Sequence, residues 1–251
     1  SAALALGLIF IGTGNTDITG AIVQAFFERD DTALQSSHTR FLCLGLGLLY
    51  MGVQETADLT LETLQALEER PFASYAALTV ETCAYAGTGN VLKVQKMLRV
   101  CGEHPEKENP AQAVAALGVA LIAFGEEIGA DMCMRSFNHL LQYGEPPVRR
   151  SVPLALGLLS VSNPTPSVID TLSKLSHDND EETAQHAVLA LGLVGAGSNN
   201  SRIALLLRQL AAFHAKNQHS LFVVRIAQGL LHMGKGASVI LSLFFFRILP
   251  L

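Results

Sequence analysis

The sequence predicts an all-α fold made of about seven two-helix repeats, arranged as a solenoid or an incomplete toroid. Two observations lead to this prediction. A helical segment rich in Gly, Ala and Leu recurs along the chain, and each copy stops at a small turn residue. The seven copies end at residues 12, 52, 87, 125, 162, 197 and 234, in steps of 35 to 40 residues. Repeats of this length stack on their neighbours and bury a continuous core.

The first helix of each repeat is expected to belong to a tightly packed inner layer. A Gly inside a helix costs about 1 kcal/mol relative to Ala. Several repeats nevertheless carry Gly at a matching position, and Thr82 and Ala120 are small substitutes. We expect these positions to allow close approach between backbones. The glycines are Gly7, Gly47, Gly157, Gly192 and Gly229.

The residues that follow each inner helix predict a turn and then an outer helix. A glycine at the end of a helix can adopt the left-handed conformation that stops it. An Asn or Asp side chain can then cap the first turn of the next helix. We expect Asp17, Asn90 and Asn199 to serve as these caps.

Two of the outer helices carry acidic stripes. At 100° per residue, Asp17, Gln24 and Glu28 fall within about 60° of one another in a helix over 17–28, which is expected to be packed on most of its other sides. The helix expected over 55–69 repeats this spacing with Asp58, Glu62, Gln65 and Glu69.

Because packed helices lie about 8–10 Å apart, the two stripes should form one acidic patch. The next outer helix is basic, with Lys93, Lys96 and Arg99, and should mark an edge of that patch. Charged stripes also occur wherever an outer helix faces water, and spacing alone does not separate the two interpretations.

Composition and motifs argue against several other classes of protein. The net charge of −5 disfavours general nucleic-acid binding, and the longest apolar run, 237–251, has only 15 residues against the roughly 20 of a membrane span. Residues 229–236 resemble a phosphate-binding loop, but Gly236 stands where a Ser or Thr hydroxyl is needed. An α/α-toroid enzyme would need clustered carboxylates on the inner helices, where Glu81 is the main one. We therefore expect no catalytic residues.

The cysteines give no sign of a metal or cofactor site. Cys43, Cys83, Cys101 and Cys133 are separated by 40, 18 and 32 residues, without the close pair that is typical of zinc ligands. Buried, reduced thiols in an intracellular protein are the expected state.

Several longer stretches resemble a known family. They are 83–95, 125–129, 143–150, 207–210 and 232–236, in addition to the repeat itself. They are similar to the proteasome/cyclosome repeats of the large non-ATPase scaffold subunits in the base of the proteasome regulatory particle. The resemblance covers about residues 1–236, which we expect to form one repeat domain. Residues 237–251 diverge, and we expect an apolar tail or a truncated repeat helix there.

The resemblance implies a non-enzymatic, cytoplasmic and nuclear scaffold without cofactors. It implies contacts with the ATPase ring and other regulatory-particle subunits, but none with nucleic acid or membrane. It also implies that outer helices bind ubiquitin and the ubiquitin-like domains of shuttle factors and a deubiquitinase. By this similarity Asp17, Gln24 and Glu28 form such a site, to which the geometry above adds Asp58, Glu62 and Glu69.

One alternative remains open from the residues alone. A helical-repeat adaptor outside the proteasome could bind peptides on its inner helices. Such adaptors display Asn, Trp or charged side chains there, whereas these inner helices are rich in Gly, Ala and Leu and the chain has no Trp.

Overall fold

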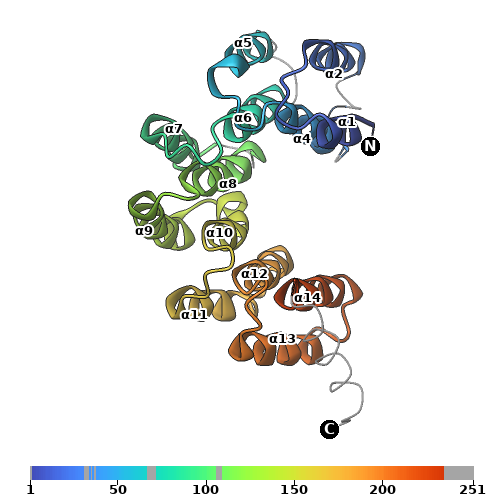
Figure 1. The fold of residues 1–251 in the computed structure, drawn as a ribbon. Helices are drawn as coiled ribbons and strands as arrows, with labels where there is room; N and C mark the ends of the chain where they lie inside the picture. Colours follow the sequence, from blue (N-terminus) through green and yellow to red (C-terminus); the bar gives the residue numbers. More distant parts are fainter. Residues whose placement is uncertain are drawn as a thin grey trace. The chain divides into compact units, whose positions relative to one another are not determined.

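The computed structural model describes residues 2–30, 34, 36, 38–66, 72–105 and 109–234. Over these residues the regular structure is entirely helical, which confirms the predicted all-α repeat fold (Figure 1). The helices predicted as inner are α1 (Ala2–Ile9), α4 (Thr39–Leu49), α6 (Ala73–Ala84), α8 (Ala111–Ala123), α10 (Pro146–Leu159), α12 (Glu181–Val194) and α14 (Gln218–Leu231). Those predicted as outer are α2 (Thr16–Glu28), α5 (Asp58–Gln65) with the 3₁₀ helix η1 (Gln54–Ala57) before it, α7 (Val91–Cys101), α9 (Glu127–Tyr143), α11 (Pro166–Leu175) and α13 (Ser201–Phe213).

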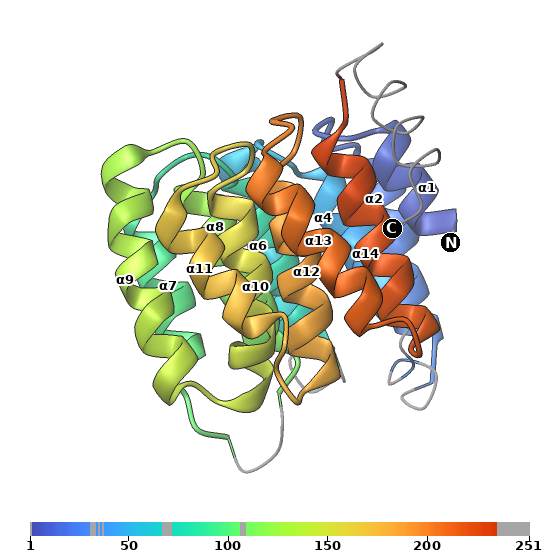
Figure 2. The ribbon, with the colours of Figure 1, turned by 90° about the horizontal axis from the view of Figure 1, so that it is seen from below.

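The chain divides into two compact units, Ser1–Val152 and Pro153–Leu251, and α10 spans the boundary. In the first unit the inner helices α1, α4, α6 and α8 pack each against the next, and α2, α5, α7 and α9 pack on them from outside (Figures 1 and 2). In the second unit α12 packs against α14, while α11 covers α12 and α13 covers α14. The predicted two-helix repeat is thus present in both units.

Small residues bring neighbouring inner helices into close contact, as the sequence predicts. A Cβ atom placed on Gly157 would lie 2.7 Å from the Cα of Ala190, and one on Gly192 would lie 2.6 Å from the Cα of Ala227. Distances this short leave no room for a side chain. Gly229 occupies the matching position in α14, and no described residue lies within 4 Å of the place that a Cβ atom would take there.

The turns that end the repeats also follow the prediction. All seven predicted end residues have positive φ, including Ser162 at 57°, where the sequence has no glycine. Several of these residues bond to the next inner helix through the backbone. The N–H of Gly12 donates to the carbonyl of Leu48 at 3.0 Å, and that of Gly197 donates to the carbonyl of Leu230 at 3.1 Å. These bonds satisfy carbonyls in the last turn of a helix, which lack partners within it.

Two of the three expected helix caps are wrong. Asn90 caps α7, but Asn15 rather than Asp17 caps α2, accepting the N–H groups of Asp17 and Ile18. Asn200 rather than Asn199 caps α13. Asn199 has a φ of 50°, so it belongs to the turn, whereas the cap residues here are extended.

The sequence predicts a repeat domain over 1–236 and an apolar tail over 237–251. The apolar tail 237–251 lies outside the described residues. The assignment of 1–236 to one repeat domain stays a prediction, as does the arrangement of the repeats as part of a toroid. Within the described residues, no helix combines the length and the apolar character needed to cross a membrane.

Candidate functional site

The predicted site residues on α2 face outward. Asp17, Gln24 and Glu28 are all exposed, and the amide of Gln24 donates a 2.7 Å hydrogen bond to the carboxylate of Glu28. The opposite side of the helix is buried against the protein through Thr19, Ile22 and Phe26.

The sequence also predicted that α2 would be packed on most of its other sides, and this is wrong beside the stripe. Phe27, next to Glu28, is 53% exposed. Among the described helices, α2 makes its main contact with α4. The stripe therefore borders an exposed aromatic ring.

The second stripe is described as far as Gln65 of α5. The helix expected over 55–69 is divided into η1 and α5, and Glu69 lies outside the described residues. Asp58 and Glu62 are exposed on α5, next to Leu59, which is 71% exposed. We call Asp17, Gln24, Glu28, Asp58 and Glu62 the stripe surface.

A buried hydroxyl joins the two stripe helices. Tyr50, at the end of α4, is only 4% exposed, and its hydroxyl accepts a 2.7 Å hydrogen bond from Thr60 of α5. The same hydroxyl lies 3.0 Å from the hydroxyl of Thr19 in α2, which itself donates to the carbonyl of Asn15 at 2.9 Å. The three hydroxyls thus form a chain of hydrogen bonds from α5 to the start of α2.

The hydrogen bonds to Tyr50 show that the two stripes occupy matching positions on their helices. Thr19 follows Asp17 by two positions, and Thr60 follows Asp58 by two positions. Because both threonines bond to Tyr50, Asp17 and Asp58 occupy equivalent positions on the two helices. Sequence reasoning missed Tyr50. The available signal was the shared 41-residue offset of the threonines and the acidic residues.

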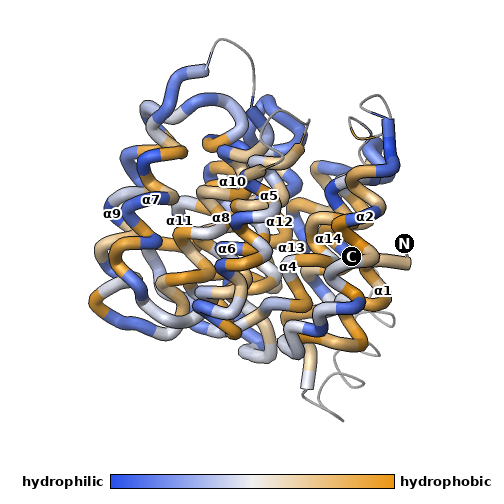
Figure 3. Tube along the Cα trace, turned by 90° about the horizontal axis from the view of Figure 1, so that it is seen from above, coloured by the Kyte–Doolittle hydropathy of each residue, from blue (hydrophilic) through white to orange (hydrophobic). Residues whose placement is uncertain are grey.

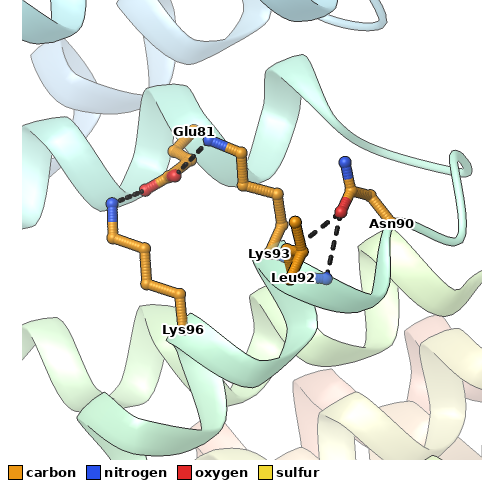
Figure 4. Close-up of polar contacts among 5 residues, drawn as sticks. All are labelled: Glu81, Asn90, Leu92, Lys93 and Lys96. Atoms are coloured by element: carbon orange, nitrogen blue, oxygen red, sulfur yellow. Dashed lines mark hydrogen bonds and ion pairs between the residues drawn. The ribbon is translucent and has the colours of Figure 1, made fainter.

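Two lysines of α7, the helix that the sequence predicts as the basic edge of the acidic patch, bond to an inner helix. The side chains of Lys93 and Lys96 point toward α6 and bond to Glu81 from two sides, as Figure 4 shows. The two carboxylate oxygens of Glu81 accept hydrogen bonds from Lys93 at 2.8 Å and from Lys96 at 2.7 Å. Lys93 also lies over the ring of Tyr85, 4.4 Å from its centroid. The side chains of Glu81, Lys93 and Lys96 are 3%, 24% and 50% exposed.

The ion pairs keep Glu81 charged despite its burial. Desolvation alone would raise the pKa of Glu81, but hydrogen bonds and charge from the two lysines outweigh it and hold the pKa below its usual value. The pKa of Lys93 is raised in turn, because bonding to Glu81 outweighs its own desolvation. This inner carboxylate, noted as an exception in the sequence, is therefore an internal anchor between α6 and α7.

The four cysteines are free and buried. Desolvation raises the pKa of Cys43 to about 12, that of Cys83 to about 11 and that of Cys101 to about 12. Thiols in this state are poor nucleophiles and poor metal ligands. Among the described residues no group of three or more His, Cys, Asp or Glu side chains is placed to hold a metal ion.

Comparison with known proteins agrees with the repeat architecture. A family model described as the proteasome/cyclosome repeat matches residues 187–217, which contain most of α12 and α13. The chain is 59% identical over 237 residues to the 26S proteasome non-ATPase regulatory subunit 2 of Dictyostelium discoideum, and this match covers 94% of the chain and 26% of the relative. The chain is a homologue of this regulatory subunit.

Other relatives agree. The 26S proteasome regulatory subunit rpn1 of Schizosaccharomyces pombe is 54% identical over 240 residues, covering 94% of the chain and 27% of the relative. Homolog A of subunit 2 from Arabidopsis thaliana is 52% identical over 235 residues, with coverage of 94% and 26%. The chain spans about a quarter of the length of these relatives.

Proposed function

We propose that the chain is a non-catalytic scaffold segment of the proteasome regulatory particle. We further propose that its stripe surface binds ubiquitin and the ubiquitin-like domains of shuttle factors and a deubiquitinase. The observation that carries the second proposal is the exposure of Asp17, Gln24 and Glu28 along one face of α2. The relatives, named as non-ATPase regulatory subunits, support the first.

The stripe surface has the chemistry that such partners need. Ubiquitin folds present a small apolar patch bordered by Lys and Arg. Asp17, Glu28, Asp58 and Glu62 supply negative charge to steer and orient this patch, and exposed apolar side chains lie beside them. Exposed ion pairs contribute only about 0.2–1 kcal/mol each, so binding should be weak and reversible. That suits a receptor that must release its cargo.

The hydrogen bonds beneath the stripe surface favour recognition of a folded domain over that of an extended peptide. The hydroxyl chain through Tyr50 holds α2 and α5 in matched register, so the partner meets charges that are already in place. Preorganisation of this kind reduces the entropy lost on binding. The remaining surface would contact the ATPase ring and other regulatory-particle subunits, in the cytoplasm and the nucleus. The relatives favour this role over that of an adaptor outside the proteasome.

Titration of ¹⁵N-labelled ubiquitin with the chain tests the proposed site. Reversing both Asp17→Lys and Glu28→Lys removes two attractions and adds two repulsions, and should weaken binding about 5- to 30-fold, which corresponds to about 1–2 kcal/mol. Reversal of the exposed Glu103 and Asp178, which belong to neither stripe helix, makes the same change in net charge and should leave ubiquitin binding nearly unchanged. Equal effects of the two double variants would show that only net charge matters and would refute the site.

A further inference from the structure

The first unit carries a second outward face with the same chemistry as the stripe surface. On α9, Ile128 is 77% exposed and Met132 is 65% exposed, and they lie one turn apart. Glu127 and Asp131 are exposed beside them. We call Glu127, Ile128, Asp131 and Met132 the α9 surface, which is defined by burial and charge alone.

The α9 surface repeats the pattern of α5 when residues are counted from the first residue of each helix. Asp58, Leu59 and Glu62 at the start of α5 correspond to Glu127, Ile128 and Asp131 at the start of α9. One buried position corresponds as well. Leu64 of α5 and Cys133 of α9 occupy the same place in the pattern, and both are buried. The exposed side chains at the starts of the two helices therefore match in charge and in apolar character.

The helix between them does not share this pattern. Figures 1 and 2 show α7 and α9 as neighbouring outer helices, and α7 carries lysines in place of the acidic residues. Lys93 and Lys96 are drawn inward onto Glu81, while Leu92 is 76% exposed. The acidic charge of α5 and that of α9 are therefore separated by a helix without exposed carboxylates of its own, which makes the α9 surface a distinct place on the molecule.

We propose that the α9 surface is a second docking site, for a protein domain whose small apolar patch is bordered by Lys and Arg. Ile128 and Met132 would enter the apolar patch, and Glu127 and Asp131 would pair with the basic groups beside it. Figure 3 shows both hydrophobic and hydrophilic stretches along α9. Arg135, one turn beyond Asp131 and exposed, limits the acidic region toward the end of the helix.

Two sites of this kind on one chain would let it hold two linked domains at once. The second domain then binds at the high effective concentration set by the linker, so weak individual contacts give a tighter complex. The inference rests on the proposed function only for the chemistry of the partner, because the α9 surface itself is defined without the stripe surface.

Methyl NMR on the whole chain tests the α9 surface with ubiquitin as the probe. With ¹³C-labelled methionine methyl groups, ubiquitin should shift the signal of Met132. It should not shift that of Met97, which is fully buried and reports on folding. Reversing Glu127→Lys and Asp131→Lys should raise the midpoint of the Met132 shift at least fivefold, whereas Gln142→Lys, an exposed position further along α9, should not.

A stripe variant separates this inference from the proposed function. In the Asp17→Lys, Glu28→Lys chain the Met132 shift should persist with less than a twofold change in its midpoint. Loss of the Met132 shift in that variant would mean one continuous site and would overturn the inference. If ubiquitin signals move in a stripe-dependent way while Met132 stays still, the α9 surface is wrong and the proposed function stands. If Met132 moves and stripe reversal changes nothing, the α9 surface stands and the stripe site is wrong.

Discussion

Replacing Lys93 and Lys96 together by methionine should destabilise the first unit strongly. The change leaves Glu81, whose side chain is 3% exposed, without the two hydrogen bonds of 2.8 Å and 2.7 Å that now compensate its burial. Removing the partners of a buried charge costs about 3–5 kcal/mol. Lys93→Met alone should cost less, because Lys96 still pairs with the carboxylate, and Lys96→Met should cost the least, because half of that side chain is in water.

The stability of the wild type and that of the double variant should change with pH in opposite directions. In the wild type the pKa of Glu81 is lowered, so its contribution to stability is complete above the usual value of 4.5 and is lost as the pH falls through the lowered pKa. Without the lysines only desolvation remains, and it raises the pKa. The double variant should therefore gain stability as the pH falls from 7 to 5, where protonation relieves the buried charge.

Urea unfolding followed by circular dichroism measures these differences, with hydrogen exchange of α6 amides as the local readout. Adding Glu81→Leu to the double variant removes the stranded charge and should restore most of the lost stability, since apolar replacement of a buried ion pair is often close to neutral. A loss below about 1 kcal/mol in the double variant, or no recovery with Glu81→Leu, would refute the view that a charged Glu81 is buried and held by the lysines.

Three further outcomes follow from the packing. Tyr50→Phe removes the hydroxyl between α2 and α5, and should cost about 1–3 kcal/mol in urea unfolding and weaken ubiquitin binding although Tyr50 itself is buried; unchanged binding would separate the hydroxyl chain from docking. Gly192→Val forces a side chain against Ala227 and should lower the thermal midpoint of the second unit. Gly229→Val, where no described residue lies within 4 Å of the added Cβ, should change the midpoint little, and equal losses would contradict the close-packing argument. The thiol of Cys43 should react with a thiol reagent at pH 8 only as the protein unfolds, and fast labelling of the native chain would contradict its burial.

The repeat was predictable from sequence because its signals are local. Helix propensity makes an internal glycine costly, so glycines that recur in step, such as Gly157 and Gly192, indicate close packing from the sequence alone. The turns were predictable for the same reason. Only Ser162 departs from glycine among the seven repeat ends, and it still adopts a φ of 57°.

The contacts between helices could not be predicted in the same way. The exposed face of α2 follows from angular spacing, but the hydrogen bonds that join Thr19, Tyr50 and Thr60 depend on where three separate helices meet. Likewise, the sequence shows Lys93 and Lys96 as charges on an outer helix, and only the tertiary structure shows that both reach Glu81. The direction of these two long side chains depends on the position of the buried carboxylate of Glu81, which the packing of α6 against α7 determines.

A charge-swap titration shows whether the stripe surface docks ubiquitin folds through complementary charge. The chain carrying Asp17→Lys and Glu28→Lys should bind wild-type ubiquitin about 5- to 30-fold more weakly, which corresponds to about 1–2 kcal/mol. Ubiquitin in which basic residues around the apolar patch are replaced by Glu should recover part of that loss with the reversed chain, while binding the wild-type chain poorly. Additive losses, with no recovery in the doubly reversed pair, would contradict docking by charge complementarity at these residues.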